Sequence, residues 1–157
     1  MNTIERDNTY VAHAYGRFPI SIVDGHGSIL VDENGKEYID FGSGIGVNIF
    51  GVNDEVWKMA VIDQIEKVQH TSNLYYTEPC TKLAELLCEK TGMKKVFFSN
   101  SGAEANECAI KAARRYAFQK YGDGHSTIIT LKNSFHGRTI TTLAATGQEH
   151  YHEEFTP

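Results

Sequence analysis

The chain lacks most of the features that would tie it to a membrane, a nucleic acid or an oxidising compartment. It has only three cysteines in 157 residues, scattered and without a C-x-x-C pair, so we expect reduced thiols in a cytoplasmic protein. No apolar run reaches the roughly 20 residues of a membrane-spanning helix, and the N-terminus has no signal-peptide pattern. The net charge of −5 gives no reason to expect nucleic acid or an anionic membrane as a partner.

A cluster of metal ligands is also lacking. His150, His152, Glu153 and Glu154 lie close together, but no second group of ligands accompanies them elsewhere in the chain. A metal site needs three or four ligands at defined positions. We therefore expect no metal site and interpret this segment as solvated.

The first third of the chain has the pattern of a small β-structure. Residues 1–19 are polar with isolated aromatics and predict an arm. Strand-like runs follow, separated by glycine-containing turns, and Asn34-Gly35 is a strong hairpin signal. The predicted strands of this β-meander cover residues 20–23, 28–31 and 36–41.

A glycine-rich segment, Gly42-Ser43-Gly44-Ile45-Gly46, comes after the meander. A dinucleotide-binding fingerprint needs G-x-G-x-x-G at the start of a helix. The spacing here differs, and residues 47–51 do not have a helical pattern. We therefore reject a dinucleotide site.

Helical patterns fill much of the remainder. Asp54 can cap a helix that runs to about His70, and a second helix begins near Thr77 and Pro79 and ends at Gly92. Apolar residues lie on one face of the first helix, namely Trp57, Val61, Ile65 and Val68. The second helix has an apolar stripe that is expected to be buried, namely Leu83, Leu86 and Leu87.

Residues 96–131 predict a β-α-β unit. Val96–Ser99 and Thr127–Leu131 read as parallel strands joined by a helix from about Ala103 to Tyr121, with a right-handed crossover. Two parallel strands need neighbours, so the sheet is expected to be incomplete. The predicted fold class is α/β, with residues 1–53 as the arm and meander of a small domain and residues 54–157 as the start of a large domain whose sheet is mostly parallel.

The turn Asn100-Ser101-Gly102 joins the first of these strands to the helix. Orphan N–H groups and the helix dipole at such a start favour an anion. Ser101 followed by Glu104 also forms a capping box, in which the helix satisfies its own donors. Both interpretations remain open, because a cap and an anion can share one helix start.

The loop at residues 133–139, N-S-F-H-G-R-T, follows the second strand. Ligands of open α/β sheets lie beyond the carboxyl ends of the strands. The turn after Ser99 and the loop after Leu131 are both expected at that edge of the sheet. Phe135 can stack on a flat ring, and Arg138 can bind a carboxylate through two parallel hydrogen bonds. The combination suits a flat, phosphorylated cofactor with a carboxylate substrate beside it.

Several linked motifs resemble those of one known family. They are Y-G-R-F-P-I (15–20), D-F-G-S-G-I-G-V-N (40–48), T-S-N-L-Y-Y-T-E-P (71–79), F-F-S-N-S-G-A-E-A-N-E (97–107), N-S-F-H-G-R-T (133–139) and A-T-G-Q (145–148). Together they resemble the class III, fold-type I aminotransferases, which use pyridoxal 5′-phosphate. Within that family the motifs are most similar to those of N-acetylornithine aminotransferases.

The resemblance implies a cofactor site in the large domain. Ser101, Gly102 and Ala103 would contact the phosphate of pyridoxal 5′-phosphate, and Phe135 would stack on its pyridine ring. The Schiff-base lysine of the family would lie beyond Pro157, so we expect no catalytic residue in this chain.

The resemblance also implies substrate contacts. Arg138 would hold the α-carboxylate of the amino acid, and Tyr15 occupies the position of an aromatic residue near that carboxylate. Ile45 stands where ornithine aminotransferases tend to carry a tyrosine, which favours an N-acylated ornithine. Residues 73–76 would lie near the interface of a homodimer.

One segment departs from the family pattern. The family usually has G-H-x-H-P where this chain reads G-V-N-D-E at residues 51–55, and we expect that segment to be structural.

The implied parent is a cytoplasmic aminotransferase of arginine biosynthesis that moves the δ-amino group of N2-acetylornithine to 2-oxoglutarate. The alternatives are an ornithine or 4-aminobutyrate aminotransferase, or a non-catalytic fragment or half of a split protein.

A first prediction concerns the 157 residues alone. Because half of the family's cofactor pocket is expected elsewhere, we expect them to bind pyridoxal 5′-phosphate weakly in an absorbance titration, and borohydride reduction to leave no specific lysine adduct in the intact mass. A tight one-to-one complex with one modified lysine would contradict this expectation.

Overall fold

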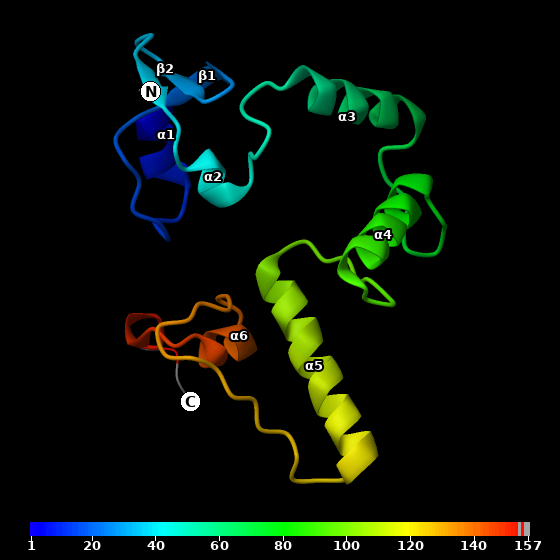
Figure 1. Cartoon of the computed structure of the whole chain (residues 1–157). Coiled ribbons are helices and arrows are strands. Elements are labelled where there is room, and N and C mark those ends of the chain that lie inside the picture. The colour runs from blue at the N-terminus through cyan, green and yellow to red at the C-terminus, as the bar shows by residue number, and fades with distance from the viewer. Residues whose placement is uncertain (154, 156–157) are drawn as a thin grey trace. The chain divides into compact units, whose positions relative to one another are not determined.

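The computed structural model describes residues 1–153 and 155 (Figure 1). Its contacts divide the chain into two compact units, Met1–Tyr75 and Tyr76–Pro157, and each is described by itself. Of the residues named above, Glu154 and Pro157 lie outside the described part. The predicted domain boundary after residue 53 stays a prediction.

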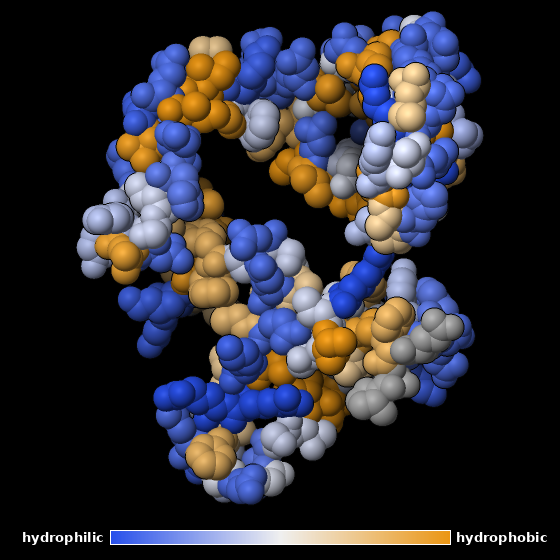
Figure 2. All heavy atoms as spheres, turned by 180° about the vertical axis from the view of Figure 1, so that it is seen from behind, coloured by the Kyte–Doolittle hydropathy of each residue, from blue (hydrophilic) through white to orange (hydrophobic). Residues whose placement is uncertain are grey.

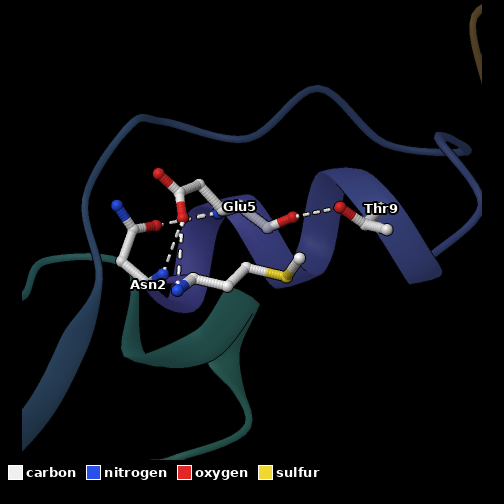
Figure 3. Close-up of polar contacts among 4 residues, drawn as sticks. Asn2, Glu5 and Thr9 are labelled. Carbon is white, nitrogen blue, oxygen red and sulfur yellow. Dashed lines mark hydrogen bonds and ion pairs between the residues drawn. The ribbon is translucent and has the colours of Figure 1, made fainter.

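The first unit begins with a helix, α1 (Thr3–Tyr10), where the sequence predicted an irregular arm. The side-chain oxygen of Asn2 accepts a hydrogen bond from the Glu5 N–H at 2.8 Å, and the Glu5 carboxylate accepts one from the Asn2 N–H at 2.9 Å (Figure 3). Thr9 also donates its hydroxyl to the Glu5 carbonyl at 2.7 Å. This reciprocal pair is a capping box, and its spacing in the sequence is the signal that could have found the helix.

The predicted β-meander is confirmed. The strands β1 (Ile22–His26), β2 (Ile29–Asp32) and β3 (Glu37–Ile39) form an antiparallel sheet in the order β1-β2-β3. The first turn is shorter than predicted, because β1 continues through Gly25 to His26, which pairs directly with Ile29.

The β2–β3 turn is organised by the carboxylate of Asp32, a buried side chain. It accepts hydrogen bonds from the N–H groups of Asn34 at 2.8 Å and Lys36 at 3.0 Å, and from the Tyr38 hydroxyl at 2.9 Å. The Lys36 N–H contributes most to holding the pKa of Asp32 below its usual value. Only Gly35 of the predicted Asn34-Gly35 pair has a positive φ, at 79°, so the connection is a three-residue turn closed by a glycine.

The glycine-rich segment forms a left-handed turn, α2 (Ser43–Gly46), in which all four residues have positive φ values between 45° and 73°. Gly44 and Gly46 adopt this conformation without steric cost. Ile45 is β-branched and does so only under strain. Such a turn is not the start of a right-handed helix, which a dinucleotide-binding fingerprint needs.

Residues 51–53 bring the chain back to the meander. Gly27 and Val52 exchange two backbone hydrogen bonds, of 2.9 and 2.8 Å. A Cβ on Gly51 would lie 2.9 Å from the Gly27 carbonyl oxygen. The segment that departs from the family pattern therefore has a structural role here.

The predicted helices are present as α3 (Glu55–Lys67), α4 (Glu78–Thr91) and α5 (Gly102–Tyr121). Asp54 caps α3 by accepting a hydrogen bond from the Trp57 N–H at 2.8 Å, and Gly92 ends α4 with a φ of 73°. None of the described helices is long and apolar enough to cross a membrane.

The expected burial of the apolar stripe on α4 is wrong for the described residues, and the apolar face of α3 is exposed as well. Neither helix has a buried residue, and Trp57 and Leu83 are 55% and 46% exposed. No described helix or strand packs closely on α3 or α4, and apolar side chains reach the surface in Figure 2. A helix stripe is buried only where a second element covers it.

The two expected parallel strands are also not formed as a ladder. Residues 96–99 and 127–131 have no paired strand within the part of the chain that the structure describes. Residues 128–131 instead line a cleft of about 290 Å³ together with Asn106, Ala109 and Ile110 of α5. A strand exists only as one side of a hydrogen-bonded pair, and neither segment has its neighbour here. The second unit is completed by α6 (Ile140–Ala145) and a 3₁₀ turn at Glu149–Tyr151.

Asp32→Asn tests the turn of the meander. Because the pKa of Asp32 is lowered in the folded chain, its charge stabilises the fold fully above the usual aspartate pKa of about 4. That contribution is lost as the pH falls through the lower folded pKa. We expect D32N to lower the urea midpoint of the NMR signals of residues 22–39 at pH 6, and to have a smaller effect at pH 2.5.

The control for this variant is Glu33→Gln, which removes the same charge from the neighbouring exposed side chain. An equal shift of the midpoint in the two variants at pH 6 would contradict the role given to Asp32.

Candidate functional site

The candidate site begins at the start of α5. The Ser101 hydroxyl accepts a hydrogen bond from the Glu104 N–H at 3.2 Å, as predicted for a cap. The Glu104 carboxylate, however, accepts from the N–H of Asn100 at 2.6 Å, one residue before the cap. These two hydrogen bonds therefore satisfy the backbone N–H groups of Glu104 and Asn100. They leave the N–H groups of Gly102 and Ala103 without a partner among the described residues.

There is room for a ligand at this helix start. A Cβ built on Gly102 would meet no atom within 4 Å. Gly102 therefore lies beside open space, and two N–H groups without a partner among the described residues stand at the positive end of the 20-residue helix α5. A helix start of this kind favours an anion. The two interpretations of the sequence, a cap and an anion site, are compatible in this geometry.

Gly137 brings the second predicted motif to the same helix start. A Cβ on this residue would lie 2.7 Å from the Ala103 Cβ and 2.6 Å from the Thr142 Oγ1, and its φ is 132°. Real Cβ atoms do not approach other atoms so closely, and L side chains avoid this φ. Only glycine therefore allows the loop at residues 135–139, hereafter the arginine loop, to lie against Ala103.

Side chains of α5 hold the arginine loop from one side. The Asn106 side-chain amide donates to the His136 carbonyl at 2.8 Å, and the Thr139 hydroxyl donates to the Glu107 carboxylate at 2.5 Å. The Thr139 hydroxyl is the main cause that lowers the pKa of Glu107. Figure 1 shows α6, which follows the loop, beside the first turns of α5.

Two threonines of the α6 region hold the loop from within. The Thr146 hydroxyl accepts a hydrogen bond from the His136 N–H at 3.0 Å and lies 3.2 Å from the Gly137 carbonyl oxygen. The Thr142 hydroxyl accepts from the Thr139 N–H at 3.1 Å. Their exposed fractions are 0% for Thr142 and 1% for Thr146. No role was predicted for these threonines; the A-T-G-Q motif marks Thr146 as part of the family pattern but does not reveal its hydrogen bonds.

The predicted ligand-binding side chains of the loop remain accessible. Phe135 is 51% exposed, and its ring packs edge-on against Tyr151, with 5.6 Å between the centroids. The guanidinium carbon of Arg138 lies 5.6 Å from the centroid of the same tyrosine ring. Tyr151 therefore contacts both predicted residues, and no sequence pattern singled it out.

Tyr15 and Ile45 belong to the first unit and are described there. Tyr15 is 62% exposed, and the Arg17 guanidinium carbon lies 5.9 Å from its ring. Ile45 is 98% exposed at the strained position of α2. Within the second unit, the approach of Gly137 to Ala103 joins the loop that carries Phe135 and Arg138 to the helix start that carries Ser101, Gly102 and Ala103.

The histidine segment makes one structural contact within the second unit. His152 Nε2 contacts the carbonyl oxygen of Thr146. Within residues 1–153 and 155, no group of three or more His, Cys, Asp or Glu side chains could hold a metal ion.

Gly137→Ala tests the approach of the arginine loop to α5. The positive φ costs about 1–3 kcal/mol for a non-glycine residue, and the overlap with Ala103 and Thr142 adds about 1–3 kcal/mol. The matched control is Gly124→Ala, because Gly124 has a positive φ of 86° but open space around it.

We expect G137A to lower the unfolding free energy in urea by clearly more than G124A, and to speed amide exchange at Thr139. Equal losses in the two variants would show that the close approach to Ala103 does not exist.

The comparisons with known proteins cover almost the whole chain. Residues 10–157 match the family model described as aminotransferase class-III. The chain is 56% identical over 151 residues to an acetylornithine aminotransferase of Haemophilus ducreyi, with 96% of this chain and 38% of that protein covered. It is 44% identical over 155 residues to a succinylornithine transaminase of Citrobacter koseri, with 99% of this chain and 38% of that protein covered. The chain therefore spans about 38% of the length of these relatives.

Solved structures give the same result for the fold. An ornithine aminotransferase from Toxoplasma gondii, with pyridoxal phosphate at partial occupancy in its active site, superposes with a TM-score of 0.90 at 28% identity, over 98% of this chain and 36% of that one. This likeness confirms the predicted N-terminal portion of a fold-type I aminotransferase. The chain belongs to the class-III aminotransferase family.

Proposed function

We propose that the protein carrying this chain is a pyridoxal-phosphate-dependent aminotransferase of N-acylated ornithine. The reaction would move the δ-amino group of N2-acetylornithine to 2-oxoglutarate, as a step of arginine biosynthesis. The observation that carries this proposal is the contact between Gly137 and Ala103, because it joins an anion-binding helix start to a loop with an aromatic ring and a guanidinium.

The residues at this site fit the cofactor. The N–H groups of Gly102 and Ala103 and the Ser101 hydroxyl would bind the phosphate, and the open space beside Gly102 leaves room for it. The exposed face of Phe135 would stack on the pyridine ring. When bound, the cofactor supplies the electron sink for transamination.

The remaining roles concern the substrate. Arg138 would bind the α-carboxylate and so fix the distance between that group and the reacting δ-amino group. Tyr15 would lie near the same carboxylate. Ile45, where ornithine aminotransferases tend to carry a tyrosine, would leave space for an N-acyl group. Both curated relatives described above have names of acylated-ornithine enzymes.

The proposal extends to the setting of the enzyme. The lysine that attaches the cofactor would lie beyond Pro157. Two lysines near the candidate site, Lys111 and Lys132, do not match the family's motif for that lysine. The enzyme would be a cytoplasmic homodimer with residues 73–76 near the interface, which agrees with the exposure of Leu74, Tyr75 and Tyr76.

Substrate assays on the full-length protein test the proposed reaction. With 2-oxoglutarate as acceptor, we expect kcat/KM for N2-acetylornithine to exceed that for ornithine and for 4-aminobutyrate. A preference for ornithine would reassign the substrate, and absence of turnover with all three donors would overturn the proposed function.

Arg138→Lys tests the carboxylate contact in the same protein. Loss of a bidentate ionic hydrogen bond costs about 1.5–3 kcal/mol, which corresponds to a loss of roughly ten- to hundredfold in kcat/KM. The exposed Arg115→Lys on α5 is the matched control. Equal kinetics of the two variants would remove Arg138 from the substrate site.

A further inference from the structure

The hydrogen bonds around Arg138 show a regular arrangement. On the N-terminal side of Arg138, the Thr146 hydroxyl binds the N–H of His136 at 3.0 Å and lies 3.2 Å from the carbonyl oxygen of Gly137. On the C-terminal side, the Thr142 hydroxyl binds the N–H of Thr139 at 3.1 Å. The backbone is thus fixed immediately before and after the arginine, while the arginine side chain itself is exposed.

These threonines are unusual for their burial. Among the described residues they are the only side chains less than 2% exposed, while Leu143 is the one buried hydrophobic residue. Burying a hydroxyl contributes little apolar stabilisation and is tolerated only when its hydrogen bonds are made. What these two side chains contribute is therefore geometry, because every hydrogen bond they make ends in the arginine loop or in α6.

The same loop is tied to the helix of the phosphate site. Asn106 and Glu107, which lie in the second turn of α5, bind His136 and Thr139. His136 and Thr139 are thus bound twice, by the threonines of the α6 region and by side chains of α5. A displacement of either threonine hydroxyl would move the arginine relative to the N–H groups at the start of the helix.

We propose that Thr146, supported by Thr142, is a positioning residue that sets the distance between the substrate carboxylate on Arg138 and the cofactor phosphate at the start of α5. This inference rests on the proposed function, since it assumes that Arg138 binds the carboxylate. The proposed role of Thr146 differs from that of the phosphate-binding N–H groups and from that of Arg138. Thr146 would touch no ligand and would act through the backbone of the arginine loop.

The test compares Thr146→Val, which keeps the shape but removes the hydroxyl, with Thr146→Ser, which keeps the hydroxyl, in the full-length protein. A displaced Arg138 would bind the α-carboxylate less tightly in the ground state and in the transition state alike, which raises KM and leaves kcat nearly unchanged. We expect T146V to raise KM for N2-acetylornithine about tenfold, with kcat changed by less than about threefold. We expect T146S to stay within about twofold of the wild type in both.

Two readouts do not depend on turnover. Amide exchange of His136, which donates to Thr146, is expected to speed up in T146V and not in T146S. The dissociation constant of pyridoxal 5′-phosphate is expected to stay the same, because the phosphate-binding N–H groups belong to α5. The control is Thr127→Val, an exposed threonine for which no hydrogen bond is found within the described part.

Asn106→Leu provides a second variant if T146V does not fold, since Asn106 binds the same loop from α5 and is only half-buried. It is expected to raise KM in the same direction. A wild-type protein without turnover would overturn the proposed function and the inference together. An active wild type with unchanged KM in T146V and N106L, or with kcat, KM and cofactor affinity all impaired together, would overturn the positioning role alone.

Discussion

The approach of the Gly137 backbone to Ala103 is the constraint on which the candidate site depends. A single missing Cβ lets the arginine loop lie against the start of α5, and the side chains of Asn106 and Glu107 then reach its backbone. Without that approach, the anion-binding N–H groups and the guanidinium would belong to separate segments. The site is therefore built by close backbone packing, and hydrogen bonds fix it in place.

Local signals in the sequence were sufficient for the elements of this site. Asp54, Ser101 and Gly92 end or begin helices where their capping chemistry predicts it. The family motifs predicted the helix start, Phe135 and Arg138 as ligand-binding groups, and these roles stay predictions. The roles of Thr142 and Thr146 could not be read in this way, because a threonine has the same pattern whether its hydroxyl is exposed or buried. Their burial depends on how the loop folds over α5, which no local spacing encodes.

The failures of prediction have a common physical origin. A buried stripe on α4 and strands at residues 96–99 and 127–131 each need a partner element. The periodicity of a sequence reports that a face is apolar, but burial and strand pairing are properties of two elements together. Asn2 and Glu5 are the opposite case: a purely local capping box was present in the sequence, and the polar composition of the arm concealed the helix that it starts.

The hydroxyl groups that hold the arginine loop have a thermal consequence. Hydrophobic packing weakens on cooling, because exposing apolar surface carries a large positive heat-capacity change, whereas exposing polar groups carries a negative one. Opening the contacts of Thr142 and Thr146 would expose mainly hydroxyls and peptide groups. The shape of the loop is therefore expected to persist in the cold, under conditions where apolar contacts elsewhere in the molecule loosen first.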